Sequence, residues 1–156
     1  MRLHVLAIGE RLVEWQQTAC DDYARRFVRP WSIEVTPVRA EPRVEAKPVA
    51  KMAAAEAQRL LAALPKSARR VVLDERGRGF STQQLADRLR DWQSAGGDVA
   101  FLLGGPDGHD PALRESADLL LSLSPMTLPH GLARVLLIEQ LYRATSILQG
   151  HPYHRD

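Results

Sequence analysis

The sequence VAFLLGGPDG at residues 99–108 joins a short, fully apolar run to a glycine-rich turn. Five consecutive apolar residues without polar alternation are typical of a strand that is covered on both faces, as in a parallel sheet. Gly104 and Gly105 let another chemical group approach the backbone, because no Cβ stands in the way. Such a turn also occurs as a simple tight connection, so by itself it does not identify a ligand site.

The segments on either side of this stretch alternate between strand and helix patterns, which favours an α/β fold with a mainly parallel sheet in one domain over residues 1–156. The predicted strands are residues 2–8, 31–38, 70–74, 99–103 and 119–123. The predicted helices are residues 10–27, 49–64, 81–95, a short one from Pro111, and 130–148. Ser81 and Gln84 predict a capping box at the start of the third helix, Gly96 and Gly97 its end, and Pro111 the first turn of the fourth. We expect loops at residues 39–48 and 75–80.

Composition limits the class of protein. The chain has 156 residues, of which 45% are hydrophobic, enough to fill one core. No run approaches the ~18 apolar residues of a membrane span, and residues 1–10 do not resemble a signal peptide. The single cysteine excludes an internal disulfide, and His151 and His154 are separated by Pro152, so we expect no metal site. These features are typical of a cytoplasmic protein.

Charge is distributed unevenly. Residues 1–80 carry 15 Lys and Arg against 10 Asp and Glu, whereas residues 81–156 carry 6 against 9. The basic excess is strongest in residues 25–51. This segment has two interpretations, a surface that contacts phosphates and an ordinary solvated loop.

The predicted helix at residues 130–148 has apolar side chains around nearly its whole circumference. A helix of this kind must be covered on all sides, which a domain of this size rarely achieves. The missing cover is expected from a second copy of the chain in a two-fold homodimer.

In open α/β sheets, ligands bind beyond the carboxyl ends of the strands. Three predicted loops leave such ends, after Asp74, Leu103 and Leu123. The last loop offers backbone groups between Met126 and Leu128, an environment that suits a flat heteroaromatic ring. The sequence lacks the phosphate-binding loop pattern GxxxxGK[ST], the dinucleotide pattern GxGxxG and the hydrolase pattern GxSxG.

Four motifs in order closely resemble the RlmH family of the SPOUT superfamily, bacterial methyltransferases that act on N3 of a pseudouridine in large-subunit ribosomal RNA. The motifs are FLLGGPDG at 101–108, SLSPMTLPH at 122–130, EQLYRA at 139–144 and HPYHR at 151–155. The resemblance extends over the whole chain. It implies a C-terminal deep trefoil knot, S-adenosyl-L-methionine as cofactor, a homodimer, and ribosomal RNA within the ribosome as partner.

Carried over by position, the resemblance implies two groups of site residues. The cofactor contacts fall on Leu73, Gly104, Leu123, Ser124, Pro125, Met126, Thr127 and Leu128. The catalytic candidates are Tyr153, His154, Arg155 and Arg143. Two places depart from the family pattern: His109, where many relatives have an apolar residue, and the loop at 39–48.

The reaction implied by the resemblance must remove the imide proton of pseudouridine, for which a positioned base typically contributes about 10²- to 10⁴-fold. We expect His154 to act as base or substrate orienter and Arg155 to contact a phosphate or an anion, with Arg143 as a second candidate. Two alternatives remain at this stage: a SPOUT enzyme with another RNA target, and a ribosome-associated RNA-binding module without catalysis. The sequence also leaves open whether the substrate is free RNA, a subunit or the whole ribosome.

Overall fold

Five parallel strands form the centre of the molecule, in the order β2-β1-β4-β3-β5. They are β1 (Arg2–Ile8), β2 (Ser32–Val38), β3 (Arg69–Gly79), β4 (Val99–Leu103) and β5 (Leu119–Ser122). The computed structural model describes residues 1–155. All of the strand pairs in this part of the chain are parallel, as the sequence predicts. The trefoil knot implied by the family resemblance is a matter of chain threading rather than strand order, and it stays a prediction.

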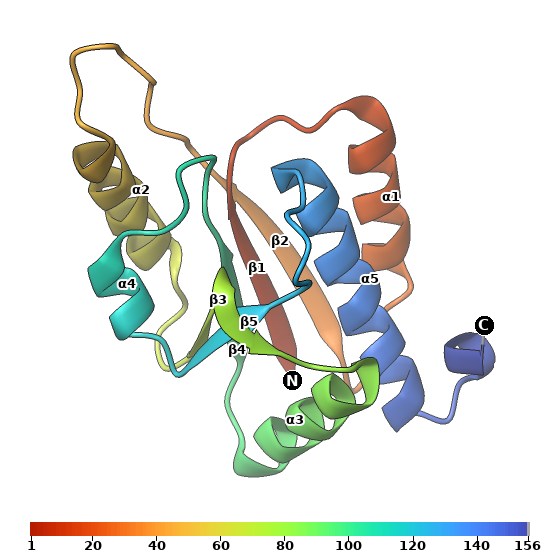
Figure 1. Cartoon of the computed structure of the whole chain (residues 1–156). Helices are drawn as coiled ribbons and strands as arrows, with labels where there is room; N and C mark the ends of the chain where they lie inside the picture. The colour runs from red at the N-terminus through yellow and green to blue at the C-terminus, as the bar shows by residue number, and fades with distance from the viewer. Residues whose placement is uncertain (156) are drawn as a thin grey trace.

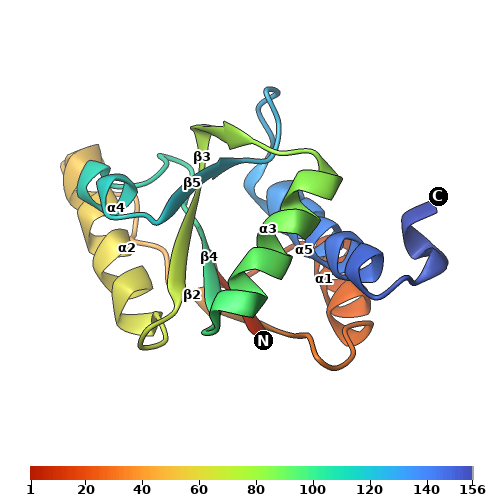
Figure 2. The ribbon, with the colours of Figure 1, turned by 90° about the horizontal axis from the view of Figure 1, so that it is seen from below.

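Helices cover both faces of the sheet and make three layers (Figures 1 and 2). On one face lie α1 (Glu14–Arg25), α3 (Thr82–Ala95) and α5 (His130–Leu148). On the other lie α2 (Val49–Ala63) and α4 (Pro111–Glu115), and a short 3-10 helix, η1 (Pro152–Arg155), follows α5. The alternation of side chains along each strand divides the core accordingly. Leu3, Val5 and Phe101 pack toward α1, α3 and α5, whereas Leu6 and Leu102 pack toward α2 and α4.

The local signals that begin and end the helices are confirmed. Ser81 and Gln84 form a reciprocal capping box at the start of α3, and Gly96 follows its end with a positive φ of 78°. Asp110 accepts hydrogen bonds from the first backbone N–H groups of α4, ahead of Pro111. Helix α1 begins at Glu14, later than the expected residue 10.

The expected loop at residues 75–80 is wrong. Strand β3 continues to Gly79, and Arg78 and Gly79 pair with Leu121 and Ser122 of β5. Both Leu73 and Arg78 have Leu121 as their register partner, so a bulge separates two stretches of pairing. The polar, glycine-rich sequence of residues 75–79 does not predict a strand, because its pairing depends on backbone groups of β5 rather than on apolar side chains.

Candidate functional site

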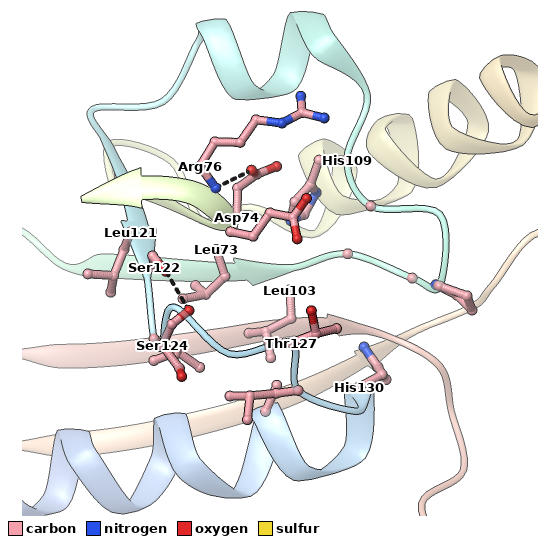
Figure 3. A pocket seen from close by; sticks show the side chains of 18 of the residues that line it. Leu73, Asp74, Arg76, Leu103, His109, Leu121, Ser122, Ser124, Thr127 and His130 are labelled. Carbon is pink, nitrogen blue, oxygen red and sulfur yellow. Dashed lines mark hydrogen bonds between the residues drawn. The ribbon is translucent and has the colours of Figure 1, made fainter. Parts of the chain in front are cut away.

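A cavity of about 720 Å³ lies at the carboxyl ends of β4 and β5, beside the bulge within β3 (Figure 3). It is bounded by the bulge of β3, the turn at residues 104–109, the loop at residues 123–129 and the start of α5. The expected loops after Leu103 and Leu123 therefore meet in one place, and the bulge of β3 stands there instead of the expected loop after Asp74. The volume lies within the range of about 300–1,000 Å³ that is typical of small-molecule sites.

The bulge of β3 forms one wall of the cavity. It carries Asp74, Glu75 and Arg76, all of which line the cavity. Oδ1 of Asp74 accepts a hydrogen bond of 2.9 Å from the backbone N–H of Arg76 (Figure 3). Its Oδ2 lies 3.6 Å from Nη1 of Arg114. The Asp74 carboxylate is thus held from two directions at the cavity wall.

Gly77 allows this wall to lie directly on β5. A Cβ built on Gly77 would lie 2.6 Å from the carbonyl carbon of Leu121 and 2.7 Å from that of Leu120. These neighbours are backbone atoms, which cannot rotate away as a side chain can. Only glycine fits where the strands approach so closely.

The glycine turn at residues 104–109 forms a second wall. The backbone N–H of Gly108 donates to the carbonyl of Gly105 at 3.0 Å, which closes the turn. His109, 6% exposed, follows with Nε2 3.1 Å from the carbonyl oxygen of Leu102. Because a carbonyl can only accept, Nε2 carries the proton. Burial lowers the pKa of the His109 imidazole, so this side chain is a neutral anchor for the turn.

The loop at residues 123–129 forms the third wall. Within it, Oγ of Ser122 donates to the carbonyl of Ser124 at 3.1 Å, and the N–H of Met126 donates to Oγ of Ser124 at 2.9 Å. Met126 is 75% exposed. Every cofactor residue implied by the resemblance lines the cavity except Pro125.

His130 and Arg134 connect the start of α5 to the end of β1. Nη2 of Arg134 donates to the carbonyl of Gly9 at 2.9 Å and to Nε2 of His130 at 3.2 Å. Nε2 of His130 is therefore an acceptor, and the proton of the neutral ring is on Nδ1. Burial and the neighbouring Arg134 charge lower the pKa of His130. His130 lines the cavity as a neutral imidazole.

The catalytic candidates of the C-terminal tail lie elsewhere. Tyr153, His154, Arg155 and Arg143 are all absent from the cavity lining. The cavity contacts the first turn of α5, whereas the tail follows its last turn (Figure 1). Helix α5 has 19 residues, so the two regions are about 28 Å apart along the helix at 1.5 Å per residue. One chain does not bring the two groups of predicted residues together.

The tail has its own network of contacts. The phenol of Tyr153 donates to Oε1 of Glu139 at 2.9 Å and lies 3.3 Å from the phenol of Tyr23. The Arg143 guanidinium lies 4.5 Å from the centre of the Tyr153 ring, and its Nε donates to Oε1 of Glu139 at 2.9 Å. Burial raises the pKa of the Tyr153 phenol, and its hydrogen bonds with Tyr23 and Glu139 raise it further. Tyr153 is therefore a fixed, protonated anchor rather than a base.

His154 has the tautomer that a base requires. Its Nδ1 bonds to the carbonyl oxygen of His151, which can only accept. In the neutral ring this leaves Nε2 without a proton and able to take one.

The structure also brings in residues that sequence reasoning missed. Arg114 and Ala133 line the cavity, and neither belongs to a sequence motif of its own. Arg76, in the glycine-bearing segment after the predicted strand end at Asp74, lines it as well. Arg114 reaches the cavity only through the placement of α4, for which the sequence has no local signal.

Comparisons with known proteins bear directly on this arrangement. A family described as "Predicted SPOUT methyltransferase" matches residues 1–154. A ribosomal RNA large subunit methyltransferase H from Methylibium petroleiphilum is 56% identical over 156 residues, covering 100% of both chains. The protein of the same name from Burkholderia thailandensis is 53% identical and covers 99% of both chains. The chain belongs to the SPOUT methyltransferases, in the family of ribosomal RNA large subunit methyltransferase H.

The resemblance inferred from the four motifs is therefore confirmed. Among solved structures, this SPOUT methyltransferase is similar to a methyltransferase of Legionella pneumophila in complex with the cofactor SAM. The TM-score is 0.53 at 15% identity, with 93% of this chain and 66% of that chain covered. At this level of identity the likeness supports the fold.

Residues 1–155 of this SPOUT methyltransferase contain neither a candidate membrane-spanning helix nor a candidate metal-binding cluster. No helix in this range has the length and hydropathy needed to cross a membrane. The same range holds no cluster of three or more His, Cys, Asp or Glu side chains arranged to bind a metal ion.

Proposed function

We propose that this SPOUT methyltransferase transfers the methyl group of S-adenosyl-L-methionine to N3 of a pseudouridine in large-subunit ribosomal RNA, acting on the assembled ribosome in the cytoplasm. The observation that carries the proposal is the convergence of the β3 bulge, the glycine turn and the 123–129 loop on one cavity. The family membership adds the reaction class, and the names of the relatives add ribosomal RNA.

The cavity fits the proposed cofactor. Leu73, Leu103 and Leu128 provide apolar lining for an adenine ring, and the loop at 123–129 adds backbone donors and acceptors at its edge. Asp74 and Glu75 place carboxylates at the wall, where they suit the hydroxyl and ammonium groups of the cofactor. S-adenosyl-L-methionine supplies a methyl group on a sulfonium, whose departure as a neutral thioether needs no acid.

The chain must then handle the imide proton of the nucleobase. Nε2 of His154 is the acceptor, because Nδ1 is committed to the carbonyl of His151. The guanidiniums of Arg155 and Arg143 suit the negative charge that develops on the ring oxygens or an adjacent phosphate. Tyr153 fixes the tail through its bond to Glu139.

The separation of tail and cavity supports a site shared between two chains. A base must come within hydrogen-bond reach of the proton it removes, and α5 holds the tail of the same chain about 28 Å away. We therefore place the tail of one protomer at the cavity of the other in a homodimer. Each protomer then contributes to both active sites.

The surface of α5 supports the same arrangement. The helix lacks a single polar face, and six of its large apolar side chains remain only half-buried within the chain. They are Leu132, Val135, Leu136, Tyr142, Ile147 and Leu148. Val135, Ile147 and Leu148 pack against the core and Tyr142 packs against other aromatic rings, which leaves Leu132 and Leu136 to be covered. Helices α1 and α3 cover the other sides of α5 (Figure 2), so a second copy is the expected cover for these side chains.

Two measurements test the proposal on the full chain. Isothermal titration with S-adenosyl-L-methionine is expected to show binding, and transfer of a labelled methyl group is expected on whole ribosomes. Free ribosomal RNA, isolated subunits and transfer RNA are assayed in parallel. Absence of cofactor binding would favour a non-catalytic RNA-binding module, and methylation of transfer RNA alone would favour another target.

Mixed dimers test the shared site. One chain lacks residues 153–156, and the other carries Gly104→Val. A Cβ at Gly104 would lie 3.1 Å from the carbonyl carbon and oxygen of Gly108, so valine displaces the turn that lines the cavity. Activity recovered on mixing supports a shared site. No recovery, with subunit exchange confirmed, would confine each site to one chain.

A further inference from the structure

Arg43 connects the segment at residues 41–47 to two other parts of the chain. Its Nε lies 2.9 Å from Oδ2 of Asp107, in the glycine turn of the cavity. Its Nη1 lies 2.7 Å from Oε1 of Glu56, in helix α2. Because a guanidinium presents several N–H donors in a fixed plane, Arg43 can hold both carboxylates at once.

Glu56 makes this contact more than an ordinary surface ion pair. Its side chain is 3% exposed, and a buried carboxylate is costly without a partner. Besides Arg43, the backbone N–H of Glu41 donates to Oε1 at 3.0 Å. Oε2 has no hydrogen-bond partner within residues 1–155. Arg43 is thus the cation that balances a carboxylate inside the protein.

The Arg43–Glu56 pair lies directly against the glycine turn. A Cβ built on Gly105 would lie 2.9 Å from Oε2 of Glu56 and 3.2 Å from Nη2 of Arg43. Gly105 and Asp107 both line the cavity. The turn is therefore supported by the ion pair behind it, in addition to its own Gly105–Gly108 bond and the His109 anchor.

A second group of charges holds the same segment to α2 without reaching the turn. Glu41 pairs with Lys47 and with Arg59. Hydrogen bonds from Lys47 and then Arg59 lower the pKa of the Glu41 carboxyl. Lys47 therefore provides a matched control, because it carries the same charge in the same segment and, within residues 1–155, forms its ion pair with Glu41 and not with the cavity turn.

We infer that Arg43 is a positioning residue for the cofactor cavity, which couples the segment at residues 41–47 to the turn at residues 104–109. The inference rests on the proposed placement of S-adenosyl-L-methionine in this cavity. Coupling between two sites is reciprocal. Cofactor binding therefore stabilises the docked segment, and loss of the Arg43 contacts weakens cofactor binding.

A double-mutant cycle on the full-length protein tests the coupling. The variants are Arg43→Gln, Asp107→Asn, their combination, and Lys47→Gln as control, with cofactor affinity measured by isothermal titration. We expect each of the first two to weaken binding about tenfold, and the double variant to be little worse than either, since residues in one ion-pair network are non-additive. Lys47→Gln is expected to stay within about twofold of the wild type. Asp107→Asn keeps the Arg43–Glu56 pair intact, so it remains informative even if Arg43→Gln does not fold.

Hydrogen exchange without cofactor gives a readout independent of binding. Arg43→Gln and Asp107→Asn are expected to speed amide exchange at residues 104–109 relative to Lys47→Gln, and cofactor is expected to slow exchange at residues 41–47 in the wild type. Unchanged exchange, or affinities of Arg43→Gln and Asp107→Asn equal to that of the control, would overturn the inference. A wild-type protein that binds no cofactor would instead overturn the proposed function, while exchange at residues 104–109 would still test whether the Arg43 contacts hold the turn.

Discussion

Replacing Gly77 with alanine tests the close approach of β3 to β5 that shapes the cavity wall. The new Cβ would lie 2.6 Å from the carbonyl carbon of Leu121, about 0.8 Å short of the 3.4 Å at which ordinary contact begins. Two more backbone atoms lie at 2.7 Å. Overpacking typically costs about 1–3 kcal/mol. Since neither strand can relieve the contact by a side-chain rotation, we expect a loss of about 3 kcal/mol.

Gly79 is the matched control on the same strand. A Cβ there would meet nothing within 4 Å, and its φ lies outside the left-handed region. Gly79→Ala is therefore expected to be neutral or to stabilise the protein by up to about 1 kcal/mol, by restricting the unfolded chain.

Urea unfolding at a fixed protein concentration measures the difference between the two variants. A shifted midpoint with an unchanged m-value is expected for Gly77→Ala, together with a melting temperature roughly 6–12 °C below that of the wild type. Its cofactor affinity is expected to fall as well, because Asp74 and Arg76 share the displaced wall. Equal stability of the two alanine variants would refute the reasoning.

Three other predictions follow from features described above. Burial lowers the folded-state pKa of His109 below the 6.5 of a free histidine. Below about pH 6.5, His109 therefore takes up a proton in the unfolded chain before it does so in the folded one. The free energy of unfolding then falls with falling pH, by at most about 1.4 kcal/mol per pH unit for this group. His109→Gln is expected to flatten that dependence in unfolding measured from pH 7 to 5, and an unchanged slope would contradict the assignment. Leu136→Arg places a charge on the half-buried face of α5 and is expected to give monomers by sedimentation. Leu141 is 0% exposed within its own chain, so Leu141→Arg is expected to unfold the protein instead. A Leu136→Arg protein that remains dimeric would argue against this interface. Deletion of residues 153–156 is expected to leave cofactor affinity unchanged and to remove methyl transfer. His154→Ala is expected to lower turnover about 10²- to 10⁴-fold, and Arg155→Ala is expected mainly to weaken RNA binding. A tail-deleted protein that still methylates ribosomes would refute the role of the tail.

Most of the fold follows from local patterns in the sequence. The apolar run at residues 99–103 is fully buried in β4, and the Ser81–Gln84 pair caps α3 as expected. The exception is the second half of β3. Its residues alternate charge with glycine, which is typical of a loop, and only pairing with a strand more than 40 positions later makes them extended.

The candidate site, like the fold, has a part that the sequence predicts and a part that it does not. That the loops after β4 and β5 meet at the carboxyl edge follows from the parallel sheet alone. The contact between Arg43, Glu56 and Asp107 has no local signal, since its members come from three separate parts of the chain and resemble ordinary surface charges. The distance between tail and cavity depends on the length and direction of α5, and motif spacing does not contain that information.

The strand order also has a consequence for how the protein is made. Strand β1 lies inside the sheet, between β2 and β4, while β5, the last strand to be synthesised, occupies the edge beside β3. A nascent chain can begin the sheet early with β1 and β2, but the cavity is complete only when β5, the loop at residues 123–129 and the first turn of α5 have been made. Domains begin to fold while synthesis continues. With the cofactor placed in this cavity as proposed, an emerging chain gains the ability to bind it only after about residue 130, so that cofactor binding marks a chain in which β5 and the start of α5 have both been made.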